Sequence, residues 1–313
     1  MIERETVIQV GNLTKRYGKL VAVDHISFSV TKGECFGFLG PNGAGKTTTA
    51  RMLTGVIRPD GGDASIVGHP AGSLRAKQVT GVVPEMANAY GDLSAWDNLM
   101  LMADLYGIPR SHARERAASL LREVGLFERK ADPAKAYSKG MKQRLILCMA
   151  LVSDPEILFL DEPTSGLDVQ SARMIMEMVR RLNRDGKTIF LTTHDMDEAN
   201  ELCDRIAVIN KGRLIAIDAP ERLRMATSGT HSVEVSFEGP VTEEALCKLP
   251  SVTRVTKMGD KFRLYTADPG QLAVTLVGYA SSKGLRIVSL NTKAPTLEDA
   301  FVALIEGGGK CVK

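Results

Sequence analysis

The first part of the chain alternates apolar and polar residues over short segments. Residues 6–39 follow a period of two, which is typical of half-buried strands, so we expect antiparallel strands ahead of a glycine-rich loop. A turn at 59–62 and a strand over 64–67 extend the same layer. Between 94 and 127 the period becomes helical, with two segments divided at 107–109. The pattern predicts an antiparallel β layer followed by a helical region.

Two short runs that are apolar throughout follow the helical region. Residues 157–160 and 188–191 are each bounded by Asp, Gly or Pro, and a helical segment near 169–184 separates them. Continuous apolar runs of this length are typical of parallel strands buried on both faces. We therefore expect an α/β fold with a mixed sheet at its core and a helical subdomain over about 85–150.

The pattern changes again beyond Arg224. Residues 225–230 read Met-Ala-Thr-Ser-Gly-Thr, which predicts a linker between a first domain over 1–224 and a second over 231–313. In the second, the expected order is strand, helix, strand, strand, helix, strand and a final helix. The first six follow the order of a ferredoxin-like unit, so we expect a small α+β accessory domain at the C-terminus.

Composition is that of an ordinary globular protein. Of 313 residues, 44% are hydrophobic and 25% charged, and the net charge of +3 with interspersed signs favours no nucleic-acid partner. Five scattered cysteines without a Cys-x-x-Cys pair favour a reducing compartment over a disulfide framework or a zinc site. The N-terminus is polar, and no apolar run approaches the roughly 18 residues of a membrane span. We expect a cytoplasmic protein that meets a membrane only through a partner.

Residues 40–47 read G-x-x-x-x-G-K-T between the apolar run 35–39 and a helical segment. The glycines let several backbone N–H groups point at one anion, and the following helix adds its positive end. Lys46 would reach the terminal phosphates, and the Thr47 hydroxyl would bind Mg²⁺. The alternative, a glycine-rich turn without a ligand, is disfavoured by the strand–loop–helix context. The expected nucleotide contacts are Gly40, Pro41, Asn42, Gly43, Ala44, Gly45, Lys46, Thr47 and Thr48.

The apolar run 157–160 ends in two carboxylates, Asp161 and Glu162. Ligands bind at the carboxyl ends of strands in open α/β sheets, so Asp161 is a candidate to hold Mg²⁺ through water and Glu162 a candidate base toward the attacking water. The alternative is that Asp-Glu-Pro only starts a helix, where acids are favoured. His194 ends the next apolar strand. A lone histidine is usually structural, but at this edge its imidazole would donate to a γ-phosphate oxygen.

Together these motifs resemble the ATP-binding subunit of an ABC transporter. The resemblance runs in the family's order across residues 6–224, and its motifs lie at 40–48, 137–144 (Tyr-Ser-Lys-Gly-Met-Lys-Gln-Arg, at the place of the family signature), 161–168 and 193–195. The segment 295–301 resembles the branch that exports drugs, polysaccharides or lipid-linked sugars. The resemblance implies a P-loop NTPase fold and an ATPase, with ATP and Mg²⁺ as its ligands.

The same resemblance implies roles for further residues. Tyr17 would stack on adenine, unless it is an ordinary strand residue. Ser138 and Gly140 would offer donors to a γ-phosphate bound by another subunit, and Asp168 would help fasten the two subunits together. Family members hydrolyse ATP as a head-to-tail pair, here a homodimer or a pair with a related ATPase, and they drive a separate membrane-spanning permease subunit. The protein would then lie on the inner face of the cell membrane.

The sequence departs from the family pattern at two places. After the signature serine the family usually has two glycines and a glutamine, where this chain has Lys139, Gly140 and Met141. A lysine is electrostatically compatible with a nearby phosphate, so we expect function to survive. The family's glutamine after the strand near 82–84 is replaced by Glu85. A carboxylate repels the γ-phosphate unless Mg²⁺ lies between them, so we expect Glu85 to bind the metal directly or through water.

In the family, the region corresponding to 85–135 transmits movement to the permease. Tyr90 and Trp96 are the better candidates for that contact, whereas plain core packing is expected for Leu99, Leu101, Leu105 and Leu120. Two other function classes are the alternatives. A DNA-repair or translation cassette ATPase usually carries a long coiled coil or two cassettes, and neither is seen here. A GTPase or small-molecule kinase would have no use for the Ser-Lys-Gly-Met element. The permease makes the passage, so this chain specifies the motor and not the cargo.

Overall fold

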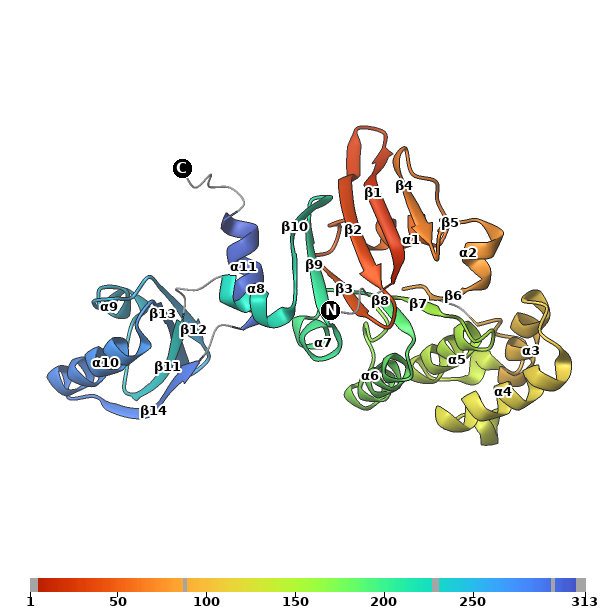
Figure 1. Cartoon of the computed structure of the whole chain (residues 1–313). Helices are drawn as coiled ribbons and strands as arrows, with labels where there is room; N and C mark the ends of the chain where they lie inside the picture. The colour runs from red at the N-terminus through yellow and green to blue at the C-terminus, as the bar shows by residue number, and fades with distance from the viewer. Residues whose placement is uncertain (1–4, 87–88, 227–230, 294–295, 308–313) are drawn as a thin grey trace. The chain divides into compact units, whose positions relative to one another are not determined.

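The computed structural model describes residues 5–86, 89–226, 231–293 and 296–307 (Figure 1). The chain divides into two compact units, Met1–Ala219 and Pro220–Lys313. The boundary precedes the predicted one because helix α8, Pro220–Ala226, starts on a proline, which is favoured at the first helical position. Met225 and Ala226 continue that helix, so the predicted linker does not begin at 225; its remaining residues, 227–230, lie outside the described part.

Residues 6–31 of the N-terminal alternation form an antiparallel sheet, as predicted. Residues 35–39, which that prediction included, instead join the central sheet and run parallel to their neighbours. The strands of the antiparallel sheet follow the order β2-β1-β4-β5. Their bounds are β1 Thr6–Tyr17, β2 Leu20–Thr31, β4 Gly61–Ile66 and β5 His69–Pro70. The apolar residues of this alternation, such as Ile8, Val10 and Phe28, are buried, so the layer presents one apolar face to the rest of the unit.

A six-stranded mixed sheet forms the centre of the first unit, in the order β10-β9-β3-β8-β7-β6. The bounds are β3 Cys35–Leu39, β6 Thr80–Val83, β7 Ile157–Asp161, β8 Thr188–Thr193, β9 Arg205–Asn210 and β10 Arg213–Asp218. Neighbouring strands are parallel except for β10. Every residue of β3, β7 and β8 is buried, which explains their uninterrupted apolar character.

The register of this sheet brings three chain segments to one edge. Leu39 pairs with Thr193, and Asp161 pairs with Thr192. The glycine loop, the two carboxylates and His194 therefore all leave the sheet at the same carboxyl ends, as the motif order predicts.

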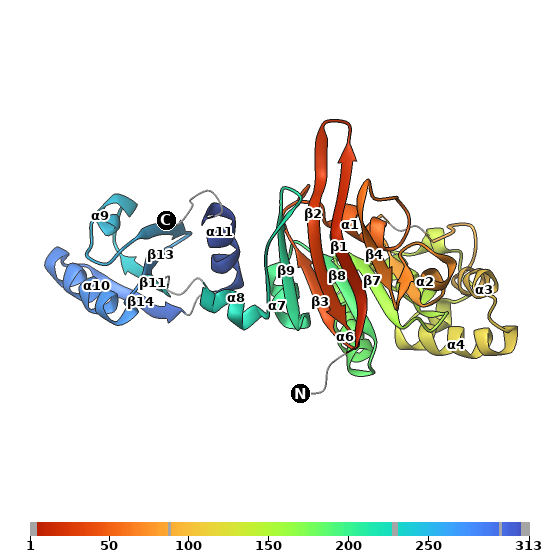
Figure 2. The same cartoon turned by 45° about the horizontal axis from the view of Figure 1, so that its top comes forward.

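Helices cover the sheets of the first unit. Their bounds are α1 Lys46–Leu53, α2 Leu74–Gln78, α3 Ala95–Leu105, α4 Arg110–Glu123, α5 Lys139–Leu151, α6 Val169–Arg184 and α7 Met196–Leu202, with short 3₁₀ turns at Phe127–Arg129 and Ala134–Ala136. Helices α3, α4 and α5 pack on one another beside the central sheet and form the predicted helical subdomain (Figures 1 and 2). Leu99 and Leu120 are buried there, but Leu105 is 69% exposed. It is the last residue of α3 and its side chain is mostly exposed, so its predicted core role is wrong.

Phenylalanines join the two sheets of the first unit. Phe28 of the antiparallel layer lies 5.4 Å from Phe36 and 5.5 Å from Phe38, measured between ring centroids. Phe190 lies 5.3 Å from Phe159 and 5.6 Å from Phe38. These rings belong to one buried cluster that also includes residues of α1. Helix α1, which carries the end of the glycine loop, is therefore fixed against both sheets.

The second unit has the predicted ferredoxin-like order. After α8 come β11 His231–Glu238, α9 Glu243–Cys247, β12 Arg254–Met258, β13 Lys261–Thr266, α10 Pro269–Lys283, β14 Arg286–Lys293 and α11 Leu297–Gly307. The antiparallel sheet runs β12-β13-β11-β14, and α10 packs on it through Leu272 and Leu276. Residue 295 of the segment 295–301 and residues 308–313 lie outside the described part. No helix within the described ranges is long and apolar enough to cross a membrane.

Candidate functional site

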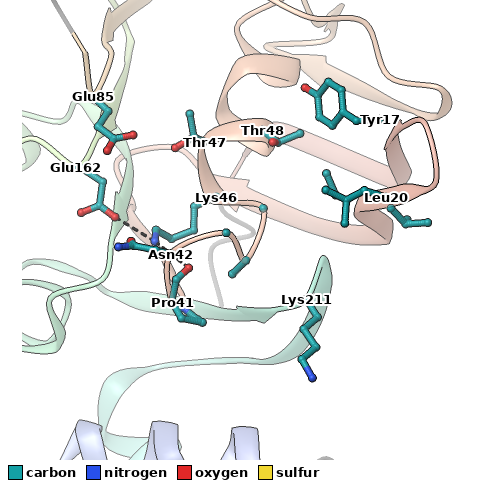
Figure 3. Close-up of a pocket in the computed structure, with 15 residues that line it drawn as sticks. Tyr17, Leu20, Pro41, Asn42, Lys46, Thr47, Thr48, Glu85, Glu162 and Lys211 are labelled. Carbon is teal, nitrogen blue, oxygen red and sulfur yellow. Dashed lines mark hydrogen bonds and ion pairs between the residues drawn. The ribbon is translucent and has the colours of Figure 1, made fainter.

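A pocket of about 630 Å³ opens on the first unit around the glycine loop (Figure 3). Its walls are formed by Tyr17, Leu20, Val21, Ala22, Pro41, Asn42, Gly43, Ala44, Gly45, Lys46, Thr47, Thr48, Glu85, Glu162 and Lys211. The sequence pattern did not predict Leu20, Val21, Ala22 or Lys211 as pocket residues. The first three belong to the β1–β2 hairpin, and Lys211 belongs to the β9–β10 turn. Only the Lys-Gly pair at 211–212 has a sequence typical of a turn between strands.

The loop requires its glycines. Gly45 has φ +110°, and a Cβ there would lie 2.6 Å from the carbonyl oxygen of Ala22. A Cβ on Gly40 would lie 2.4 Å from the carbonyl oxygen of Ile209. The loop is thus pressed between β2 and the β9–β10 hairpin, and Gly212 N–H donates to Ala44 O at 2.9 Å. No side chain caps α1, and its first turn carries no acidic residue, so its backbone amides face the pocket mouth, ready for an anion.

Lys46 is buried at the first turn of α1, with 5% of its side chain exposed. Its Nζ donates to Gly40 O at 2.7 Å and to Pro41 O at 3.3 Å, and lies 3.1 Å from Glu162 Oε1. Two carbonyl groups of the glycine loop therefore fix the position of the Lys46 ammonium, and its third partner is the carboxylate of Glu162.

Glu162 has a strained backbone and a doubly engaged carboxylate. Its φ is +52°, in the left-handed region, and its N–H donates to Thr192 O at 3.0 Å. The side chain is 7% exposed, between Lys46 and His194, whose Nδ1 donates to Oε2 at 2.6 Å. The contact of Oε1 with Lys46 is an ion pair without regular hydrogen-bond geometry. A carboxylate held this way is oriented and desolvated, as a general base requires.

His194 has one ring nitrogen on Glu162 and one that remains for the predicted phosphate contact. Because Nδ1 is used on Glu162, Nε2 is the ring nitrogen left for a phosphate oxygen. Half of the imidazole is exposed. His194 thus orients Glu162 in addition to any phosphate contact.

Thr47 lines the pocket, and Asp161, the last residue of β7, is bonded to it. Thr47 Oγ1 donates to Asp161 Oδ1 at 3.2 Å, and Thr192 Oγ1 donates to the same oxygen. Burial raises the pKa of Asp161; both hydroxyls oppose this, and the charges of Glu85 and Glu162 add to it. Glu85 lines the pocket from the segment after β6 (Figure 3). Three oxygen donors converging in a negative field fit a hard divalent cation. Among the described residues no group of three or more His, Cys, Asp or Glu forms a metal cage of its own.

Seven of the expected residues are not among those that line the pocket. Gly40, Asp161 and His194 are bonded to residues that do line it, namely Lys46, Thr47 and Glu162. The other four, Ser138, Lys139, Gly140 and Asp168, lie at the N-termini of α5 and α6. Ser138 Oγ caps α5 by accepting from Met141 N at 3.3 Å, and Asp168 caps α6 by accepting from Ser171 N at 2.8 Å. Ser171 holds the pKa of Asp168 below its usual value through these hydrogen bonds. A Cβ on Gly140 would lie 2.3 Å from Ser171 Oγ, so the two helix ends touch.

The side chain of Lys139 is bonded within its own chain. Its Nζ donates to Ser165 O at 3.0 Å, in the loop that joins Glu162 to Asp168. The reason is the close approach of α5 and α6, which places the side chain over that loop. Lys139 therefore ties the signature segment to the carboxylate loop of its own chain.

Tyr17 and Leu20 form the opposite end of the pocket from Glu85 and Glu162 (Figure 3). Tyr17 is 49% exposed and Leu20 is 65% exposed, both beside the β1–β2 turn. The ammonium of Lys15 lies 5.7 Å from the centroid of the Tyr17 ring. An exposed aromatic face at this end fits the expected contact with a base.

Comparison with known proteins gives one family. The ABC transporter family model matches residues 23–165. The Nod factor export ATP-binding protein I of Ralstonia nicotianae is 41% identical over 95% of this chain and 93% of its own length. The linearmycin resistance ATP-binding protein LnrL of Bacillus subtilis is 37% identical over 95% of this chain and 98% of its own length. These likenesses extend over both units.

Solved structures agree for the first unit. An ATP-binding subunit of an ABC transporter has a TM-score of 0.65 and 29% identity, covering 70% of this chain and 92% of that one. A dimeric ATP-binding cassette in a post-hydrolysis state, bound to ADP and Pi, has a TM-score of 0.62 and 26% identity, covering 68% of this chain and 98% of that one.

Proposed function

This chain belongs to the ATP-binding subunits of ABC transporters, and on that premise we propose that it hydrolyses ATP in the pocket of Figure 3 to drive export through a separate membrane-spanning subunit. The observation that supports this most is the buried pair of Lys46 and Glu162. A candidate phosphate-binding cation at the start of α1 and a candidate base directly after β7 meet at 3.1 Å in one pocket.

The geometry supports a division of labour within the pocket. Loop amides and the first turn of α1 bind the phosphate oxygens, and Lys46 exchanges the carboxylate of Glu162 for a phosphate oxygen, another anionic acceptor. Glu162, still held by His194, then accepts a proton from the attacking water. As the water oxygen bonds to the γ-phosphorus, the bond from that phosphorus to the ADP oxygen breaks. With both ring nitrogens protonated, His194 would donate from Nδ1 to Glu162 and from Nε2 to the departing phosphate.

Mg²⁺ fits the oxygen donors around Thr47. Thr47 and Asp161 would hold it, with Glu85 contributing directly or through water. When bound, the ion would neutralise charge on the terminal phosphates. Between cycles, the hydroxyls of Thr47 and Thr192 keep Asp161 oriented.

The positions of Ser138, Lys139, Gly140 and Asp168 support a paired assembly. They lie outside the pocket walls of their own chain, yet Ser138 begins a helix whose amides suit an anion. We propose that they face the nucleotide of a second copy, or of a related ATPase. The dimeric cassette bound to ADP and Pi is consistent with such pairing.

The helical subdomain offers a surface for the membrane partner, and this would keep the protein at the inner face of the cell membrane. Met86 is 85% exposed and Tyr90 is 55% exposed, directly after Glu85, whereas Trp96 is only partly exposed. Tyr90 N–H donates to the buried Asn98 side chain at 2.8 Å, which links this surface to α3. The relatives named for Nod factor export and linearmycin resistance support an export partner.

The assay that tests the proposal is ATP hydrolysis by the full chain at increasing protein concentration with Mg²⁺ present. If two chains complete each site, the rate per chain rises with concentration and levels off, because only pairs are active. A rate per chain that stays constant rejects the paired site. Failure to bind ATP at millimolar Mg-ATP rejects the function itself.

A further inference from the structure

A buried acid that the mechanism does not use lies next to the site. Glu198, on α7, is 3% exposed. Its Oε1 accepts from Thr164 Oγ1 at 3.1 Å, and its Oε2 is buried without a hydrogen-bond partner among the described residues. Burial of a carboxylate with one oxygen unpaired costs free energy, so the position of Glu198 calls for an explanation.

Thr164 belongs to the loop that carries the candidate base. That loop runs from Glu162 to Asp168, and it is closed by bonds from Ser165 N to Glu162 O at 3.1 Å and from Leu167 N to Thr164 O at 3.1 Å. A displacement at Thr164 is therefore passed to both ends of the loop.

Glu198 belongs to the segment that carries His194. Asp195, directly after His194, caps α7 by accepting from Glu198 N at 3.0 Å. Two side-chain bonds thus join the same two segments: His194 to Glu162 at 2.6 Å, and Glu198 to Thr164 at 3.1 Å. The first reaches the pocket, and the second lies behind it in the interior.

We propose that Glu198 is a positioning residue for ATP hydrolysis, which holds Thr164 and its loop so that Glu162 stays aligned with His194. This inference rests on the proposed function. Glu198 is not among the residues that line the pocket, so it would act through Glu162.

The charges around Glu198 indicate that it works as a neutral acid. Asp195 on its own element and Glu162 on the facing loop both carry negative charge toward it, and the thiol of Cys203 at the end of α7 also faces it. Burial, aided by these charges, raises the pKa of Glu198 to about 7, although Thr193 and Thr164 partly oppose this. A second charge behind Glu162 would push the two segments apart, so alignment weakens as Glu198 loses its proton.

The experiment compares kcat and KM for ATP in wild type, Glu198→Gln, Glu198→Ala and Thr164→Val between pH 6 and pH 9. Loss of the hydrogen bond in Glu198→Ala or Thr164→Val is expected to lower kcat about fivefold to tenfold, with KM for ATP within about twofold. Glu198→Gln keeps the bond without the charge, so its kcat relative to wild type rises with pH through about pH 7. The double variant Thr164→Val/Glu198→Ala costs no more than either single one.

Asp197→Asn is the matched control, an exposed acid one residue earlier on the same helix, and it is expected to behave as wild type. If Glu198→Ala does not fold, Thr164→Val carries the test alone. Wild-type kcat in Thr164→Val, or a Gln to wild-type ratio that does not change with pH, overturns the inference. A wild-type chain that neither binds nor hydrolyses ATP instead removes the proposed function, so the two failures are distinguishable.

Discussion

The two ends of the nucleotide pocket are built in different ways. At the phosphate end, Lys46 and Glu162 are almost fully buried and are bonded to the glycine loop, to β8 and to the segment after it. At the other end, Tyr17 and Leu20 come from one hairpin, and both are exposed to solvent. The phosphate end is organised before a ligand arrives, whereas the base end offers an open apolar face.

This difference predicts where binding energy and catalysis reside. Preoriented charged groups in a desolvated site contribute far more than contacts at an exposed surface. Substitutions at the phosphate end should therefore change rate or affinity strongly, and substitutions at the base end should change affinity modestly.

Glu162→Gln tests the phosphate end most severely. The amide cannot take up a proton from water, so hydrolysis is expected to slow by about 10²–10⁴. ATP binding should persist, since glutamine leaves Lys46 free for the phosphates, and size exclusion in Mg-ATP should show a trapped dimer. Hydrolysis at the wild-type rate would remove Glu162 from the role of base.

Lys46→Ala and Lys211→Ala compare how much a lysine at each end of the pocket contributes to ATP affinity. Loss of the buried ammonium removes a charge-assisted contact, so ATP affinity should fall by roughly 10- to 100-fold. Lys211, at the exposed β9–β10 turn, should cost about twofold or less, because an exposed charge is screened by solvent. Calorimetric titration with Mg-ATP gives both numbers, and equal losses would contradict the contrast between the ends.

Glu85→Gln examines how the metal is held at the phosphate end. If the carboxylate meets the ion directly or through water, the Mg²⁺ concentration for half-maximal ATPase activity should rise by about 10-fold. Glutamine keeps the size of the side chain, so the variant should fold normally. An unchanged melting temperature is the control for this. An unchanged Mg²⁺ requirement would reject a metal role for Glu85.

Sequence was a good guide to what lies within one strand–loop–helix segment. The glycine loop, the carboxylates after β7 and His194 after β8 were each predicted from local pattern, and the parallel sheet explains why they converge. Contacts between side chains of different segments could not be predicted from local pattern. Lys139 on Ser165, His194 Nδ1 on Glu162 and the burial of Glu198 depend on how α5, α6 and α7 pack. The end of α8 was missed because Met225 and Ala226 support a helix as well as a linker.

Tyr17→Ala probes the base end, and it has the smallest expected effect. Removal of an exposed ring should raise KM for ATP by about fivefold, since stacking on one base is worth on the order of 1 kcal/mol at a solvated site. Tyr17→Phe keeps the face and should match wild type, because stacking does not use the hydroxyl. A face contact reads any purine, so GTP should be hydrolysed within about tenfold of ATP. Strict selectivity for one purine would mean that polar groups recognise the edge of the base. The base end would then be as specifically organised as the phosphate end, which would contradict the contrast between them.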